Sequence, residues 1–133
     1  MTLQERVKRQ AAYWTETAWH DWRTAQSLWK SKRYDACLFF CHLVLEKILK
    51  AAVVIKTRQD APRIHDLMRL SVIAGLTLDE QKQNMLIDIN HFNIAGRYPA
   101  DQKAFYKLAT RQYSARYYQF TKEFLKWVIK NQH

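Results

Sequence analysis

Three polar side chains recur every four residues within a strongly apolar stretch of this sequence. His42, Glu46 and Lys50 would share one face of a helix, where their side chains can form a ladder of ion pairs and hydrogen bonds. A strip of this kind among apolar neighbours needs polar partners. Two interpretations stay open: the strip lines a ligand site, or it is a network that satisfies buried polar groups and fixes the register of the helix.

A ligand cleft at this strip would be closed by side chains from other segments. Asp21 lies in the preceding predicted helix, and His65 and Arg97 lie in or beside predicted loops. A guanidinium presents a planar set of donors that binds phosphate in a bidentate manner. The strip and these three residues together predict a site for an anionic group, with Arg97 as its phosphate ligand.

Arg97 and Tyr98 come directly before Pro99, in a connection that we expect to be exposed. Loops on a rigid scaffold often carry binding residues, which favours a functional role for both side chains. In the alternative interpretation Tyr98 covers the core, and Arg97 pairs with Glu46 or Asp88.

The charge of the chain is strongly basic. It has 22 Lys and Arg against 12 Asp and Glu, a formal charge of +10, which favours contact with phosphate or an acidic partner, although it also serves simply to keep a protein dispersed. Lys103, Lys107 and Arg111 follow one another at steps of four on the predicted last helix, so they predict a basic stripe. A second trio on that helix is more typical of a solvated face (Lys122, Lys126 and Lys130).

Cys37 and Cys41 are the two cysteines of the chain. Four residues apart on one helix, their side chains point in parallel directions that suit a disulfide poorly, so we expect buried free thiols. A metal site formed with His42 would need a fourth ligand at a zinc-like spacing, and the sequence offers none. We therefore predict no metal and no cofactor.

The elements that must position these residues are helices. Only two Gly and two Pro occur in 133 residues, too few for the many turns of an all-β domain. Apolar positions at alternating spacings of three and four predict five helices. The first extends from about Leu3 to Lys30, and the second from Tyr34 to about Ile55. A short helix follows from about His65 to Ala74, with Gly75 after its end. The fourth starts with a Thr77 and Glu80 capping box and stops near Ala95, and the last is capped by Asp101 and continues past Val128.

Three long helices with short connections are expected to pack as antiparallel neighbours. We therefore predict a single all-α domain over residues 1–133, an up-and-down four-helix bundle with one additional short helix. The charged N-terminus and the lack of an apolar run of about 18 residues predict a cytoplasmic protein without a membrane span.

Four pieces of the sequence, in this order and spacing, resemble the HEPN domain family. They are Asp21 with Ala25, the stretch YDACLFFCHLVLEKILKAAV with His42, Glu46, Lys47, Leu49, Lys50 and Ala51, the HDL of His65 to Leu67, and the RYP of Arg97 to Pro99. The resemblance implies an α-helical bundle that is commonly dimeric. It also implies a small protein paired with a minimal nucleotidyltransferase, often as a toxin and antitoxin module.

Some members of that family are ribonucleases with an Arg followed, after four to six residues, by a His. Here Gln102, Lys103 and Ala104 stand at the three offsets after Arg97, so the histidine is missing. Arg58 and His65 fit the spacing, but they flank a predicted loop, and a catalytic pair needs a fixed geometry.

Our leading hypothesis is a nonenzymatic subunit that binds a nucleotide, an RNA or a nucleotidyltransferase partner. We expect a homodimer, because the apolar and aromatic positions of the first and last helices exceed what one face of a small bundle needs. The alternatives are a metal-independent HEPN ribonuclease toxin and a purely structural oligomerisation bundle. The candidate binding residues are Asp21, His42, Glu46, Lys47, Lys50, His65, Arg97 and Tyr98, with Lys103, Lys107 and Arg111 as a basic surface.

Overall fold

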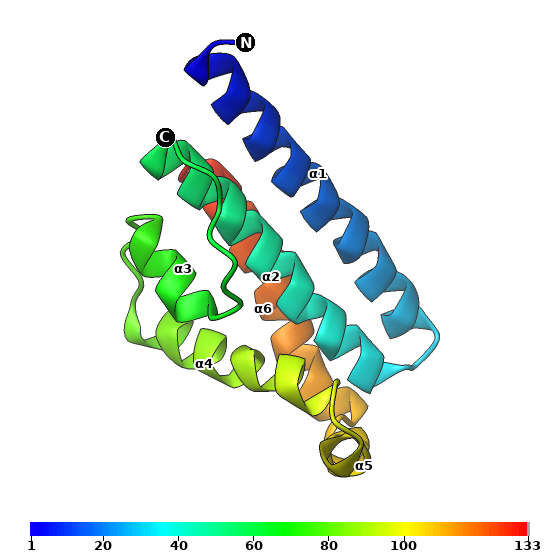
Figure 1. Cartoon of the computed structure of the whole chain (residues 1–133). Helices are drawn as coiled ribbons and strands as arrows, with labels where there is room; N and C mark the ends of the chain where they lie inside the picture. Colours follow the sequence, from blue (N-terminus) through cyan, green and yellow to red (C-terminus); the bar gives the residue numbers. More distant parts are fainter. Residues whose placement is uncertain (133) are drawn as a thin grey trace.

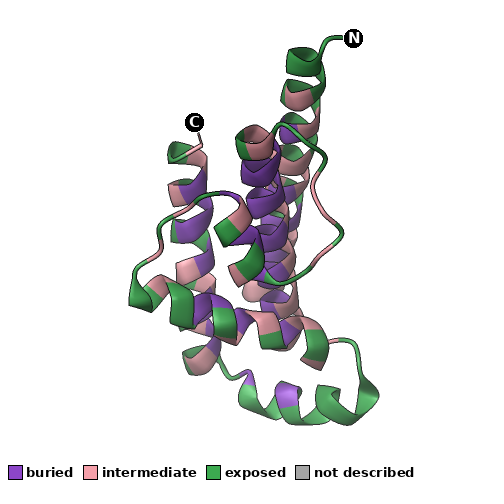
Figure 2. Ribbon diagram, turned by 60° about the vertical axis from the view of Figure 1, so that its left-hand side comes forward, coloured by how far each residue is buried: buried purple, intermediate pink, exposed green. Residues whose placement is uncertain are grey.

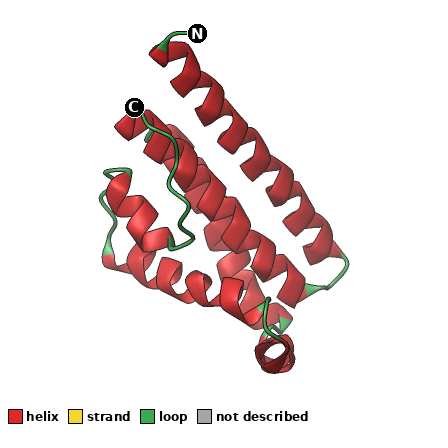
Figure 3. Ribbon diagram, viewed as in Figure 1, coloured by secondary structure: helices red, strands yellow, loops and turns green. Residues whose placement is uncertain are grey.

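A computed structural model describes residues 1–132 of the chain. Over these residues it contains six helices and no strand (Figures 1 and 3). The helices are α1 (Leu3–Lys30), α2 (Tyr34–Thr57), α3 (Leu67–Ile73), α4 (Glu80–Ala95), α5 (Pro99–Leu108) and α6 (Arg111–Lys130). The prediction of an all-α fold is confirmed. No helix in this part of the chain is long and apolar enough to cross a membrane.

α1 and α2 form an antiparallel hairpin, and both have the bounds expected from their apolar periodicity (Figure 1). The hydroxyl of Thr2 caps α1 by accepting a hydrogen bond from the backbone N–H of Glu5 at 3.1 Å. α2 is the central element, because α1 and α6 pack along it, and most of its side chains are buried. The helix that carries His42, Glu46 and Lys50 is thus held from several sides.

α3 begins later than predicted, at Leu67 rather than His65. The carboxylate of Asp66 accepts from the backbone N–H groups of Met68 and Arg69, so Asp66 is the N-cap. This cap leaves His65 outside the helix, in an extended loop that lies over α2. The predicted end of α3 is confirmed, with Gly75 in the left-handed region at a φ of 71°.

α4 is capped by Asp79 and not by the predicted Thr77. Asp79 directly precedes the first helical residue, and its carboxylate accepts from the backbone N–H of Lys82 at 2.8 Å. The helix ends at Ala95, as predicted. At the following Gly96 an added Cβ would lie 2.8 Å from a ring carbon of Phe39, so a glycine is needed for the close approach of this corner to α2.

The predicted single last helix is wrong, because two helices occupy this part of the chain. Pro99 is the first residue of α5, so Asp101 lies inside its first turn instead of capping it. α5 ends at Leu108, and the hydroxyl of Thr110 then caps α6 by accepting from the backbone N–H of Tyr113 at 3.2 Å. The apolar period continues across this break, and periodicity alone therefore missed it.

The core lies between α2 and the inner faces of α1, α3, α4 and α6. Figure 2 shows the buried positions gathered there, whereas α5, at the bottom of that view, is mostly exposed. Phe105 and Ala109 anchor the α5 segment, but Leu108 between them is 52% exposed. α4 crosses below α2 and α6 obliquely (Figure 1), and residues of its second half line a pocket together with His65.

Candidate functional site

Glu46 is the centre of a polar cluster in the middle of α2. Its Oε2 lies 3.0 Å from Nζ of Lys50, and its Oε1 lies 3.0 Å from Nδ1 of His65. Nδ1 of His42 is 3.7 Å from the same Oε1. Glu46 is only 7% exposed, so the strip predicted on one helix face is present and is joined by a ring from the loop before α3.

His42 is almost fully buried beneath that loop. Its Nε2 lies 3.1 Å from the backbone carbonyl oxygen of His65, and because a carbonyl only accepts, this nitrogen carries the proton. Burial above all, with smaller contributions from His65 and Arg97, lowers the pKa of His42 to about 4, although Glu46 and the His65 carbonyl act in the opposite direction. His42 is therefore neutral at pH 7, and within residues 1–132 its Nδ1 has no hydrogen-bond partner.

Lys50 contributes to the interior of the cluster and not to its surface. Its side chain is 8% exposed, and its ammonium lies 5.2 Å from the centre of the Trp14 ring as well as against Glu46. A buried cation held by a carboxylate and an aromatic face is well paired. Lys50 thus joins α1 to α2 and leaves no free charge for a ligand.

A pocket of about 240 Å³ opens above this cluster, between the His65 loop and α4. It is lined by His42, His65, Asp66, Asn90, Asn93 and Ile94. Asn90 ties the two sides together, since its Oδ1 accepts from the backbone N–H of Leu67 at 2.9 Å and its Nδ2 donates to Asp66 at 3.1 Å. Asn90 and Asn93 were not among the residues predicted from the sequence. The pattern that indicates them is two amides three residues apart, with Arg97 four residues after the second.

Arg97 is bonded to Asn93 of this lining but is not itself a lining residue. Its Nε donates to Oδ1 of Asn93 at 3.0 Å, and its side chain is exposed. Among the described residues it pairs with neither Glu46 nor Asp88, so the alternative that buried it in an ion pair is wrong. The guanidinium keeps the two terminal NH2 groups for another acceptor.

Tyr98 does not cover the core. Its side chain is 57% exposed, and its backbone serves as the N-cap position of α5. It therefore lies on the surface beside Arg97.

Asp21 and Lys47 are placed together, but outside this pocket. The ammonium of Lys47 donates to the buried carboxylate of Asp21, and Nδ1 of His20 is 3.4 Å from its other oxygen. Residue 47 is rotated by about 100° from residue 46 on the helix, which turns it toward α1. The expectation that Asp21 closes the cleft at Glu46 is wrong, because it pairs across the interface of α1 and α2 instead.

The predicted basic stripe does not form on one helix. Lys103 and Lys107 are exposed on α5, but Arg111 is the first residue of α6, beyond the break. The guanidinium carbon of Arg111 lies 5.6 Å from the centre of the Trp29 ring, so it packs on the end of α1. The three residues thus have no common helix face.

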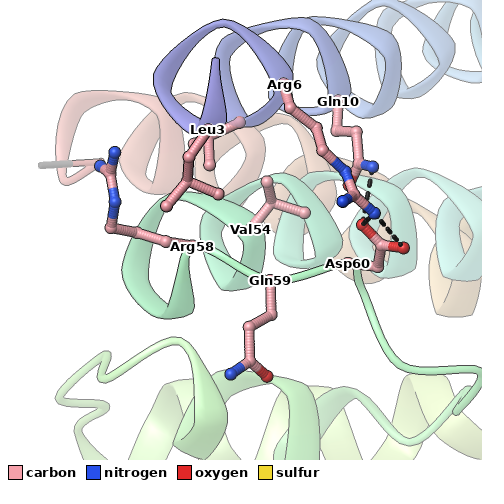
Figure 4. Close-up of a pocket in the computed structure, with 8 residues that line it drawn as sticks. Leu3, Arg6, Gln10, Val54, Arg58, Gln59 and Asp60 are labelled. Carbon is pink, nitrogen blue, oxygen red and sulfur yellow. Dashed lines mark hydrogen bonds and ion pairs between the residues drawn. The ribbon is translucent and has the colours of Figure 1, made fainter. Parts of the chain in front are cut away.

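Arg58 and His65 belong to different pockets. Arg58 is the C-cap of α2 and lines a pocket of about 330 Å³ between the start of α1 and the end of α2. In Figure 4 its guanidinium points away from Asp60, which accepts from Arg6 and Gln10 on the other side. The spacing of Arg58 and His65 therefore does not produce a catalytic pair.

Cys37 and Cys41 are buried free thiols, as predicted. The thiol of Cys37 donates to the backbone carbonyl of Ala25 at 3.3 Å, and hydrogen bonding with Cys41 and burial raise its pKa far above the usual range. In residues 1–132 no three His, Cys, Asp or Glu side chains gather in a way that could hold a metal ion. The candidate site presents imidazole, amide, carboxylate and guanidinium groups.

Comparison with known families agrees with this arrangement. Residues 11–132 match the HEPN domain family. The chain belongs to the HEPN family. Neither a curated protein nor a solved structure matches it significantly. The HEPN match extends over the polar cluster at Glu46, the pocket above it and Arg97, and the family expected from the sequence is confirmed.

Proposed function

We propose that this HEPN domain is a nonenzymatic subunit that binds the phosphate of a nucleotide at the pocket between His42, His65 and Arg97. The exposed guanidinium of Arg97, bonded to the lining residue Asn93, is the observation that carries the proposal. Charge-assisted hydrogen bonds from an arginine to phosphate are short and strong. Because Asn93 already orients the side chain, less ordering entropy opposes binding.

The lining of the pocket suits a ligand with an anionic end. Asp66 is its one carboxylate, and the Oδ1 of Asp66 accepts hydrogen bonds from the backbone N–H groups of Met68 and Arg69 and from the side chain of Asn90. At about 240 Å³ the pocket is smaller than the roughly 300 to 1,000 Å³ typical of whole small-molecule sites. We infer that it holds one part of a nucleotide, while the rest lies on the surface near Tyr98.

A protein partner is a second candidate for the same surface. We propose that a minimal nucleotidyltransferase, as in toxin and antitoxin modules, contacts this pocket and the exposed lysines of α5. The formal charge of +10 favours an acidic or phosphate-bearing partner. Co-purification of the chain with a minimal nucleotidyltransferase, in a defined ratio, is the corresponding test.

Nucleotide titration tests the main proposal directly. The Arg97 Nε–H signal should shift in NMR spectra when ATP is added, and adenosine at the same concentration should leave it in place. Binding of adenosine as tightly as ATP would contradict a phosphate site. Binding of neither would leave a purely structural oligomerisation bundle as the better description.

A second function, metal-independent RNA cleavage, is favoured by one observation. His65 is exposed, and its Nδ1 is held by the carboxylate of Glu46, which leaves Nε2 as a base. That base would take the proton of a ribose 2′-hydroxyl, whose oxygen attacks phosphorus and expels the 5′-oxygen, leaving a 2′,3′-cyclic phosphate. The departing oxygen needs a proton donor, and the neighbouring imidazole, His42, is buried and neutral. Binding is therefore the better supported function.

A further inference from the structure

A larger groove lies on another part of the molecule, between α4, α5 and α6. Its volume is about 480 Å³, twice that of the pocket at His42. It is lined by Asp88, His91, Phe92, Ile94, Ala95, Asp101, Ala104, Phe105, Leu108, Tyr113 and Tyr117. The two linings share Ile94, but none of the polar residues assigned above to nucleotide binding lines this groove, so the polar groups of the two sites are separate.

Aromatic and aliphatic side chains form the walls of this groove. The Phe92 ring centre lies 5.4 Å from that of Phe105 and 5.0 Å from that of Tyr117. Ile94 and Leu108 are 51% and 52% exposed at its edge. Large apolar side chains exposed around a concavity usually mark a place where another molecule binds. The groove can therefore bury the apolar part of a ligand.

The charge of the groove is opposite to that of the protein. Counting histidine as neutral, its charged lining residues are Asp88 and Asp101, with no Lys or Arg, although the chain has a net charge of +10. The hydroxyl of Tyr117 donates to Oδ2 of Asp88 at 2.9 Å and orients that carboxylate. Burial and this hydrogen bond raise the pKa of Tyr117, which keeps it a donor. Arg116 lies outside the lining, 5.7 Å from the Tyr117 ring centre.

From this charge complementarity we propose that the groove binds a small organic cation, an ammonium or guanidinium group on an apolar body. The cation contacts the carboxylates of Asp88 and Asp101, and the body lies along Phe92, Phe105 and Leu108. Carboxylates give charge-assisted hydrogen bonds, and aromatic walls favour cations further. Two carboxylates repel phosphate, so a nucleotide is not the occupant.

Three probes with nearly the same body separate charge from apolar burial. They are 2-phenylethylamine, 2-phenylethanol and 3-phenylpropionate, titrated calorimetrically into the whole chain. The amine should bind about tenfold tighter than the alcohol, the worth of one hydrogen bond to a charged group, and the propionate should bind most weakly. Equal affinity for amine and alcohol overturns the proposal.

Variants with matched controls locate the binding. Asp101→Asn should weaken amine binding about three- to tenfold, between the effects of an exposed ion pair and a charged hydrogen bond. Glu80→Gln, which removes one charge from the first turn of α4 outside the groove, should leave it unchanged. A wild-type response from Asp101→Asn overturns the carboxylate contact.

Filling the groove gives an independent test. Ala104→Phe should abolish amine binding, whereas Ala100→Phe, an exposed α5 position outside the lining, should not. If Ala104→Phe binds the amine normally, the site lies elsewhere. A different result would be that the wild type is a dimer that does not bind the amine and that Ala104→Phe is a monomer. In that case a second copy of the chain occupies the groove, and the proposal is overturned. Arg97→Ala should leave amine binding intact, so this proposal and the nucleotide site can fail separately.

Discussion

Nδ1 of His65 lies 3.0 Å from Oε1 of Glu46, so an exposed ring in the loop before α3 is tied to a buried carboxylate in the middle of α2. The backbone carbonyl of the same histidine accepts from the buried ring of His42. Two hydrogen bonds at one residue thus hold the loop over the helix. The geometry of the pocket therefore depends on groups that also stabilise the fold.

Replacing Glu46 tests the structural role of this cluster. Glu46→Gln leaves the ammonium of Lys50, with a side chain 8% exposed, without its counter-charge. Breaking a buried pair in this way should lower the free energy of unfolding by about 3 to 5 kcal/mol, measured by urea denaturation. Asp79→Asn, which weakens an exposed pair with Lys82 but keeps the helix cap, should change stability little. Wild-type stability of Glu46→Gln would show that the cluster serves binding alone.

Buried His42 should make stability depend on pH. Its pKa in the folded protein is about 4, against an ordinary value of 6.5, so between these values the unfolded chain binds the extra proton. Stability is therefore complete above about pH 6.5 and decreases as the pH falls toward 4, by at most about 3 kcal/mol. His42→Gln should flatten unfolding free energies measured across this range, whereas His91→Gln, an exposed histidine, should not. If the unfolding free energy of His42→Gln keeps the wild-type dependence on pH, carboxylates and not His42 cause that dependence.

Removing Arg97 should affect binding much more than folding. Its guanidinium is exposed and bonded to Asn93, so Arg97→Ala should keep the wild-type melting temperature. Loss of its phosphate contacts should weaken ATP binding by roughly 1.5 to 3 kcal/mol in calorimetric titrations. Arg63→Ala removes an equal charge from the His65 loop without altering the pocket lining. Equal losses in both variants would indicate general attraction to a basic surface rather than a site.

We expect no appreciable ribonuclease activity, because the exposed base His65 has no exposed imidazole beside it as proton donor within the pocket lining. Labelled RNA incubated with the protein and EDTA should remain intact. If it is cut to cyclic phosphate ends, and His65→Ala but not His91→Ala stops the reaction, the ribonuclease assignment is correct and the binding assignment is wrong.

A homodimer is expected, but on a smaller surface than the sequence suggested. In the first helix Leu3 and Tyr13 are 55% and 59% exposed, whereas the large apolar side chains of α6 are at least partly buried. Figure 1 shows α1 along one edge of the molecule, with its outer side uncovered. Sedimentation should give a dimer for the wild type and a monomer for Tyr13→Glu. A monomeric wild type at micromolar concentrations would remove this prediction.

The sequence by itself determined the helical fold and much of its detail. Thr2 and the apolar period defined α1, and a glycine with a positive φ ended α3 where expected. The spacing of Glu46 and Lys50 was enough to predict their contact, because residues four apart on a helix are neighbours whatever surrounds them. These features are local, so a few residues carry the information for each.

Only the tertiary structure decided which segments meet. The apolar period does not reveal the break before Thr110, because apolar positions continue on both sides of it. Phe105 would pack on the core whether this segment formed one helix or two. From the sequence, Asp21 could pair with any of several basic residues. The rotation of α2 relative to α1 determines that its partner is Lys47. His65 reaches Glu46 because Asp66, and not His65, caps α3. The contact between α4 and the His65 loop gives Asn90, Asn93 and Arg97 their place at the site. This contact depends on the packing of side chains that are far apart in the chain.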